Sequence, residues 1–272
     1  MDDSNKNQNL HTHTTYCDGA LSVEEMILAA MEKGCGSIGF SEHSHVFFDD
    51  IYSLSPEATR QYVSEVDRLK SKYDGRIEVF LGLERDSYSD IEADIDFDYI
   101  IGSVHYINQN ICVDAGEQDQ KQSVDRFYAG DFYAFIEDYF AATADVIIKT
   151  GADIVGHFDL VTKFNLHGKL FDETHPRYIA AALGAMDELL KHCKLFEVNS
   201  GAMYRFGKPQ PYPSAFLLKE LQKRGGQVIR SSDSHDAESI CYNYDEMRRL
   251  LISCGFKYEK RLTKNGFADA AL

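Results

Sequence analysis

The sequence lacks several features that would place it in common classes of protein. No apolar run approaches the about 20 residues that a membrane-spanning helix needs, which excludes a transmembrane helix. The six cysteines include no C-x-x-C pair, and none is followed by arginine six residues later, which excludes the phosphate loop of cysteine-dependent phosphatases. We therefore expect reduced thiols. Residues 1–6 lack the basic and apolar regions of a signal peptide, so a cytoplasmic location is expected.

Positive charge is also scarce. Lysine and arginine number 28 against 44 acidic residues, which gives a formal net charge of −16. Binding to nucleic acid depends on cationic surface that releases counterions, so we expect no nucleic-acid partner, and no membrane partner either. Bound divalent cations would offset part of the negative charge.

Internal repeats, low-complexity tracts and linkers rich in Pro, Gly or Ser are missing as well. A single domain over residues 1–272 is therefore expected. The hydrophobic content of 44% is sufficient for a sizeable core in one unit of this length.

Short apolar segments recur along the chain and alternate with segments of helical periodicity. The pattern predicts a strand ending near residue 10 and strands over residues 37–40, 77–83, 98–104, 153–156, 195–199 and 227–230. Seven strands alternating with helices indicate a parallel sheet, and the chain length is typical of a closed α/β barrel.

Local signals place helices between these strands. Ser22 and Glu25 form a capping box before a helix that ends near residue 34, and Pro56 takes the first position of another helix. Further helices are predicted over residues 132–150 and 179–192, before residue 225, and near the end of the chain. The polar stretch over residues 108–131 is predicted to be a long loop at the active-site rim.

Residue types that bind metals follow the ends of the predicted strands. Side chains two positions apart leave the same face of a strand, so His11 and His13 can reach one ion. A lone histidine is more often a core residue than a ligand, but six of the ten histidines occupy strand ends, where barrels place their chemistry. The candidate metal ligands are His11, His13, Asp18, His43, Glu84, His105, His157, Asp233 and His235. Histidine nitrogens with carboxylate oxygens suit zinc, manganese or iron.

These segments resemble the ordered motifs of the polymerase and histidinol phosphatase (PHP) superfamily. The matching segments are His11-Thr12-His13 with Asp18, Ser41-Glu42-His43, Gly82-Leu83-Glu84, Gly102-Ser103-Val104-His105, Gly156-His157-Phe158-Asp159 and Ser232-Asp233-Ser234-His235. The resemblance implies the α/β PHP fold, a distorted (βα)7 TIM-like barrel, with a centre of three divalent metal ions. One departure is Asn9, where the superfamily usually has Asp; we expect this position to lie behind the ligands.

The resemblance also implies how the ligands divide among three ions. The first ion would be held by His11, His13, Glu84 and Asp233. Glu84 would bridge to a second ion held by His105 and His157, and Asp18, His43 and His235 would hold the third.

Within the superfamily, residues 160–165, 199–201 and 211–213 are similar to loops of the stand-alone histidinol-phosphate phosphatases. This resemblance implies that Lys163 and Arg205 bind the substrate phosphate, although Lys163 stands where Arg is more usual. The implied reaction is hydrolysis of L-histidinol phosphate, a small phosphorylated metabolite, to L-histidinol and phosphate in histidine biosynthesis.

Elementary chemistry assigns catalytic roles to Glu84, Asp18 and Arg205. Two ions bridged by the Glu84 carboxylate would lie about 3.5–4 Å apart, where a shared hydroxide can attack phosphorus. Arg205 would stabilise charge on the phosphate oxygens, and Asp18 or a metal-bound water would protonate the leaving alcohol. Weaker candidates for recognising the imidazole and ammonium groups of the substrate are Glu42, Asp159 and Tyr204.

Other functions remain open. A PHP phosphoesterase or nuclease could act on another phosphate ester, and a metal-dependent amidohydrolase or deaminase also uses an H-x-H motif at a barrel rim. A metal-binding module without turnover is a further alternative. The sequence does not define the oligomeric state.

Overall fold

The computed structural model describes residues 6–49, 51–90, 94–108 and 111–272. Its centre is a seven-stranded parallel sheet in the order β1-β2-β3-β4-β7-β8-β9. The strands are β1 (Gln8–Asn9), β2 (Ser37–Phe40), β3 (Glu78–Asp86), β4 (Tyr99–Ser103), β7 (Ile154–Val155), β8 (Leu195–Asn199) and β9 (Gln227–Ser231). The predicted seven parallel strands are therefore confirmed.

The sheet closes into a barrel where its first and last strands meet. Beyond β1 and β9 the chain continues as a parallel bridge between Thr12 and Ser234. The His13 N–H donates to the Ser234 carbonyl at 2.8 Å, and the Ser234 N–H donates to the His11 carbonyl at 3.0 Å. Because these bonds lie past the carboxyl ends of both strands, the barrel is joined at the same end as the predicted metal ligands.

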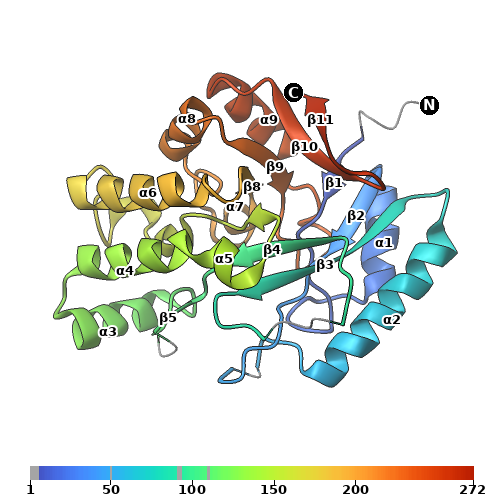
Figure 1. Cartoon of the computed structure of the whole chain (residues 1–272), viewed down its shortest axis with the longest axis horizontal. Helices are drawn as coiled ribbons and strands as arrows, with labels where there is room; N and C mark the ends of the chain where they lie inside the picture. Colours follow the sequence, from blue (N-terminus) through green and yellow to red (C-terminus); the bar gives the residue numbers. More distant parts are fainter. Residues whose placement is uncertain (1–5, 50, 91–93, 109–110) are drawn as a thin grey trace.

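Helices cover the outside of the barrel (Figure 1). They are α1 (Val23–Glu32), α2 (Pro56–Tyr73), α4 (Phe132–Ala144), α5 (Val146–Thr150), α6 (Pro176–Leu189), α8 (Ala215–Lys223) and α9 (Tyr244–Ser253). The predicted capping box of α1 is present, since the Ser22 hydroxyl accepts from the Glu25 N–H and the Glu25 carboxylate accepts from the Ser22 N–H. The apolar faces of α1 and α2 pack together against β2 and β3, while α4, α6 and α8 share the larger cluster with β7 and β8. No helix in the described ranges is both long and apolar enough to cross a membrane.

Tyr99 fills the middle of the barrel. Its ring is fully buried, and its hydroxyl donates to the carbonyls of Leu10 and Phe40. A Cβ atom built on Gly82 would lie 2.2 Å from this ring, and one on Gly39 would lie 2.5 Å from its hydroxyl. Glycine at both positions is therefore required for the close approach of β2 and β3 to the ring.

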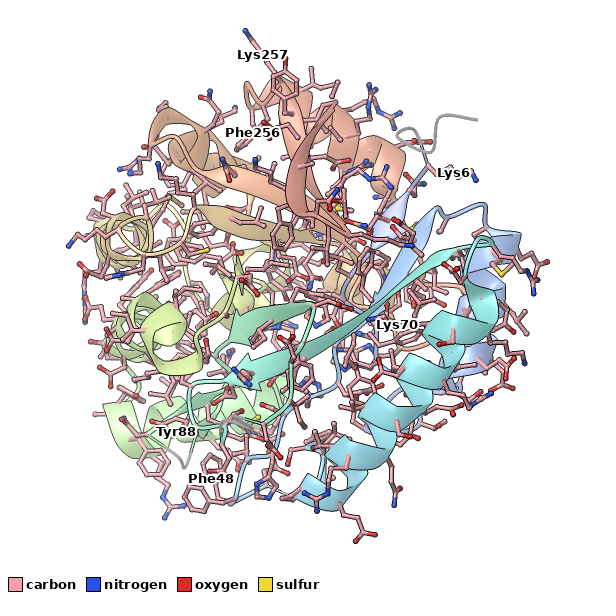
Figure 2. The ribbon with its side chains drawn as sticks, turned by 45° about the vertical axis from the view of Figure 1, so that its right-hand side comes forward. Lys6, Phe48, Lys70, Tyr88, Phe256 and Lys257 are labelled. Atoms are coloured by element: carbon pink, nitrogen blue, oxygen red, sulfur yellow. The ribbon has the colours of Figure 1, made fainter. Side chains whose placement is uncertain are left out.

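A C-terminal hairpin, β10 (Tyr258–Thr263) with β11 (Gly266–Ala271), covers the amino end of the barrel. Leu262 packs with Phe80 and Ile229 inside the barrel, and its backbone exchanges two hydrogen bonds with the Gln8 side chain. The side chains in Figure 2 place Phe256 and Lys257, which precede β10, on the opposite side of the molecule from Phe48 and Tyr88.

The structure differs from the predicted local structure in three places. The stretch over residues 108–131, of which 109–110 lie outside the described residues, was predicted to be a loop. It contains β6 (Ile111–Cys112), which pairs antiparallel with β5 (Tyr106–Ile107) just before the stretch, and the helix α3 (Glu117–Tyr128). The single helix predicted over residues 132–150 is two helices, which separate at Asp145. The segment after β8 forms a short helix, α7 (Gly201–Phe206), that was not predicted.

Candidate metal centre and active site

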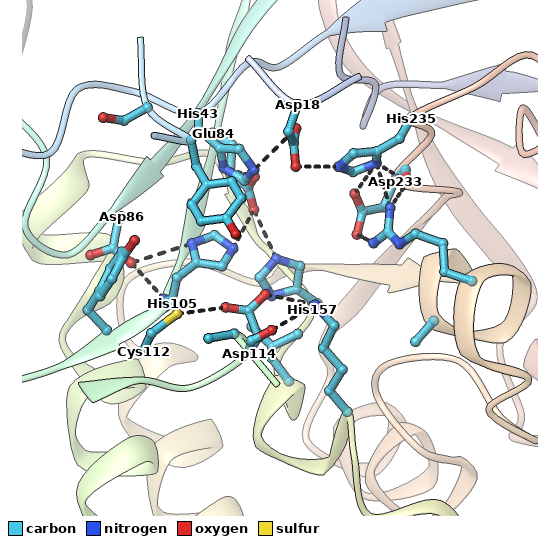
Figure 3. Close-up of a pocket in the computed structure, with 18 of the residues that line it drawn as sticks. Asp18, His43, Glu84, Asp86, His105, Cys112, Asp114, His157, Asp233 and His235 are labelled. Atoms are coloured by element: carbon cyan, nitrogen blue, oxygen red, sulfur yellow. Dashed lines mark hydrogen bonds and ion pairs between the residues drawn. The ribbon is translucent and has the colours of Figure 1, made fainter. Parts of the chain in front are cut away.

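All nine predicted ligands come together at the carboxyl end of the barrel. Figure 3 shows those that line the cavity, from Asp18 and His43 to Asp233 and His235. Seven of them follow the carboxyl end of a strand: His11 and His13 come after β1, His43 after β2, His105 after β4, His157 after β7, and Asp233 and His235 after β9. Asp18 lies in the loop between β1 and α1. Glu84 was predicted to follow its strand, but β3 continues to Asp86, so this carboxylate projects from within the strand.

The Glu84 carboxylate is the centre of the cluster. One oxygen, Oε2, lies 3.3 Å from His11 Nε2, 3.6 Å from His13 Nε2 and 2.9 Å from His43 Nδ1. The other, Oε1, lies 2.9 Å from His157 Nε2 and 3.6 Å from His105 Nε2. Two oxygens that face separate sets of imidazoles are what a carboxylate bridging two ions requires.

The donor atoms form several groups whose members lie within 4.8 Å of one another. The group His13, Asp18, His43 and His235 contains all the ligands expected for the third ion and adds His13. The group His11, His13 and Asp233 contains three of the four ligands expected for the first. The expected ligands of the second ion divide between two groups, His11 with Glu84 and His157, and His43 with Glu84 and His105.

Several of these donor atoms make no hydrogen bond within the protein, although they lie close to one another. Among the buried side-chain atoms of the described residues, His11 Nε2, His13 Nε2, Glu84 Oε2 and His157 Nδ1 make no hydrogen bond. Leaving such atoms unpaired in a protein interior costs free energy, and a cation is the partner that satisfies nitrogen lone pairs and a carboxylate oxygen together. The site is therefore suited to divalent metal ions.

Burial and neighbouring charges shift the pKa values of the histidines in opposite directions. Burial, together with His43 and His235, lowers the pKa of His13 to about 3, so its nitrogens are available as neutral ligands. Burial also lowers the pKa of His105, but the carboxylates of Glu84, Asp86 and Asp114 outweigh it and raise the pKa to about 9. Burial would raise the pKa of Glu84, yet the surrounding histidines hold it well below its usual range. Burial would likewise raise the pKa values of Asp18 and Asp233, but neighbouring histidines and, for Asp233, Arg205 lower them. The three carboxylates among the predicted ligands are thus ionised near neutral pH.

A layer of residues behind the ligands was not predicted. The carboxylate of Glu197, in β8, lies 2.5 Å from His11 Nδ1 and also accepts from the His157 N–H at 2.8 Å. Asp86 faces His105 Nδ1 at 3.5 Å. Carboxylates in this position fix the orientation of a histidine ligand and increase its basicity. The one available signal was a glutamate in the middle of an apolar strand, because buried parallel strands rarely carry a charge.

Asn9, the departure from the superfamily pattern, also lies behind the ligands. It is fully buried, and its amide donates to the His11 carbonyl at 3.0 Å and to the Thr12 and Ser234 hydroxyls. It therefore joins β1 to the segment after β9, at the point where the barrel closes.

The metal-ligand cluster forms one wall of a cavity of about 300 Å³, and Lys163 and Arg205 lie in its lining. The Arg205 guanidinium donates to the Asp233 carboxylate at 2.9 Å and to the Asp233 carbonyl at 2.8 Å. Lys163 lies 2.9 Å from the carboxylate of Asp114, a lining residue that was not predicted. The weaker candidates Glu42, Asp159 and Tyr204 do not line this cavity, and the first two are fully buried.

Comparison with known proteins identifies the family to which this barrel belongs. A closed parallel barrel whose carboxyl-end rim carries histidines and carboxylates around one cavity is typical of metal-dependent hydrolases. The chain belongs to the PHP domain family, whose model matches residues 9–201.

Among curated proteins, the chain is 27% identical to a probable histidinol-phosphatase of Deinococcus radiodurans over 90% of this chain and 92% of the relative. It is 24% identical to the histidinol-phosphatase of Bacillus subtilis over 86% and 96%. Among solved structures, the histidinol phosphate phosphatase of Lactococcus lactis, complexed with zinc, L-histidinol and phosphate, superposes with a TM-score of 0.76 at 22% identity, covering 97% of this chain and 99% of that one. The predicted PHP barrel is thereby confirmed.

Proposed function

We propose that this protein is a metal-dependent phosphomonoesterase that hydrolyses L-histidinol phosphate to L-histidinol and phosphate. One observation carries the proposal: the residues expected as PHP metal ligands lie beside a small cavity that two cationic side chains, Lys163 and Arg205, also line. The relatives of similar length are named histidinol-phosphatases, and the Lactococcus lactis structure holds zinc with both products of that reaction. Such an enzyme would act in histidine biosynthesis.

Divalent ions are the cofactor that the donor set fits, and three of them, as zinc, manganese or iron, are part of the proposal. The ligands would be His11, His13, Asp18, His43, Glu84, His105, His157, Asp233 and His235. When bound, such ions lower the pKa of water to supply a nucleophile near neutral pH and neutralise the charge of a phosphate group.

The residues of the chain have separate roles in this proposal. Glu84, with an oxygen toward each set of histidines, holds those histidines in one arrangement. Arg205 and Lys163 orient the phosphate, and the guanidinium of Arg205 offers two donors to oxygens on which charge increases in the transition state. Asp18, hydrogen-bonded to His235 Nε2 at 3.1 Å, lines the cavity and would relay a proton to the leaving alcohol.

The shape and charge of the cavity favour a small substrate. Lys163 and Arg205 are the lysine and arginine side chains among its described lining residues. A nucleic-acid strand would need a longer cationic track than this. One domain, residues 1–272, would carry the whole activity.

The test is phosphate release from a substrate panel. L-Histidinol phosphate, O-phosphoserine, p-nitrophenyl phosphate and single-stranded DNA would be assayed with and without a chelator, and with zinc, manganese or iron restored separately. We expect selective turnover of L-histidinol phosphate that the chelator abolishes and a metal restores. Equal rates on all simple esters would contradict the substrate, and cleavage of DNA alone would favour a PHP nuclease.

A further inference from the structure

One carboxylate in the cavity is not used by the proposed metal centre. Asp114 follows β6, where the Val113 N–H donates to the His105 carbonyl at 2.8 Å and so returns the chain to the rim. Its side chain is 20% exposed and lines the cavity. Figure 3 shows Asp114 beside His105 and His157, on the side of the cluster away from Asp18 and His235.

The other carboxylates that line the cavity each have a partner in or directly behind the metal centre. Asp18 bonds to His235 and Glu84 to His157, while Asp233 bonds to Arg205. Asp86 accepts from the backbone N–H groups of His105 and Tyr88. Within the described lining, Asp114 alone has a lysine as its ion-pair partner, at 2.9 Å, and that lysine is one of the two cations proposed to bind phosphate.

The proposed substrate, like this pair, carries one positive and one negative group side by side. In L-histidinol phosphate the ammonium group is on the carbon next to the phosphorylated CH₂, so a positive and a negative group lie close together. If the phosphate binds at Lys163, the ammonium comes to the adjacent position, where a carboxylate is required. The opposite charges of Lys163 and Asp114 are therefore complementary in sign to the two neighbouring charges of the substrate.

We propose that Asp114 binds the ammonium group of the substrate and so selects amino-alcohol phosphates over other phosphomonoesters. This inference rests on the proposed function, because it takes L-histidinol phosphate as the substrate. A charge-assisted hydrogen bond in a partly buried cavity contributes enough binding energy to change affinity by about ten- to a hundredfold.

Asp114 could instead only hold Lys163 in place for the phosphate. The two roles differ in which substrates lose activity. A residue that positions Lys163 affects every phosphomonoester equally, whereas a residue that binds ammonium affects only substrates that carry one.

The experiment compares L-histidinol phosphate with its des-amino analogue, 3-(imidazol-4-yl)propyl phosphate, in the metal-loaded enzyme. The wild type should prefer the amino substrate in kcat/KM by about ten- to a hundredfold. Asp114→Asn should lose that preference, mainly through a higher KM for the amino substrate, while kcat/KM for the analogue falls far less. Retained turnover of the analogue also shows that the variant folds and binds metal.

Two further variants serve as controls. Lys163→Met should lower kcat/KM for both substrates to a similar extent, because both carry the phosphate. Glu117→Gln removes an acidic group three residues away, at the exposed start of α3, and should leave the preference unchanged. An equal loss on both substrates in Asp114→Asn would overturn the inference and leave Asp114 as a positioning residue. Failure of the wild type to hydrolyse L-histidinol phosphate would instead overturn the proposed function itself.

Discussion

At the scale of single residues, the site is built from buried carboxylates that alternate with imidazoles. Exposure increases from the inside of the barrel outward: the side chains of His11 and His13 are 0% exposed, that of His105 is 13%, and those of His43 and His235 are 20% and 19%. The interior ligands are therefore fixed by packing, while the outer ones border the cavity where substrate enters.

Glu197→Gln tests the layer behind the ligands. The substitution keeps the volume of the side chain but removes the charge that faces His11 Nδ1 at 2.5 Å. Loss of such a partner typically lowers metal affinity by about ten- to a hundredfold, and we expect a fall of that size with kcat/KM reduced in parallel at limiting metal. Competition with a chromophoric chelator measures the affinity. Glu188→Gln on the exposed face of α6 is the matched control, and unchanged affinity in Glu197→Gln would contradict the proposed role.

At the scale of elements, the sequence predicted most of the barrel because its strands are short apolar runs that end in histidine or acidic residues. The failures have physical causes. Helix α3 is polar, and within it only Gln120 and Val124 are buried, so it has almost no apolar stripe. The hairpin β10–β11, which was not predicted, alternates weakly, since most of β11 is exposed. Glu197 and Asp114 were missed because their roles depend on neighbours that only the fold brings close.

The C-terminal hairpin depends on a buried ion pair. Arg230 in β9 and Glu259 in β10 make two bonds of 2.6 Å, with both side chains about one-tenth exposed. Glu259→Gln leaves the buried guanidinium uncompensated, so we expect the free energy of unfolding to fall by about 3–5 kcal/mol. Asp269→Asn, which removes the exposed partner of Lys260 in the same hairpin, should cost under about 1 kcal/mol. Urea denaturation measures both, and equal losses would show that burial of the pair is unimportant.

Two free thiols from elements far apart in the sequence lie close together. Cys35, after α1, and Cys241, before α9, have sulfur atoms 3.3 Å apart. We expect oxidised glutathione to convert this pair to a disulfide: the two thiols lose two hydrogen atoms, and the glutathione disulfide is reduced to two thiols. Because the bond would join positions 206 residues apart, it should raise the thermal midpoint.

Intact mass and peptide mapping detect this disulfide. Cys35→Ser should abolish it, whereas Cys193→Ser should not. Oxidation that produces only mixed disulfides with glutathione would disprove the pairing.

At the scale of the whole molecule, the net charge of −16 and the metal centre belong together, because divalent cations bound at the rim offset repulsion among carboxylates that the fold concentrates there. A ligand that binds only the folded state stabilises it, by about 4 kcal/mol for an ion present at a thousand times its dissociation constant. In a chain of this size each kcal/mol shifts the thermal midpoint by about 2–4 °C. Removal of the ions by a chelator should therefore lower the midpoint by about 10 °C or more and abolish phosphate release, and zinc, manganese or iron should restore both.

The same treatment of Glu84→Gln separates metal loss from other effects of the chelator. This variant lacks the carboxylate whose two oxygens face His43 and His157, so it should contain fewer ions as purified, melt at a lower temperature, and respond less to chelation. Differential scanning calorimetry with elemental analysis of the same samples gives both quantities. The contrary outcome is an unchanged thermal midpoint in wild-type protein shown to be free of metal. The fold alone would then hold the histidines and carboxylates of the rim in place, and the ions would contribute to catalysis without contributing to stability.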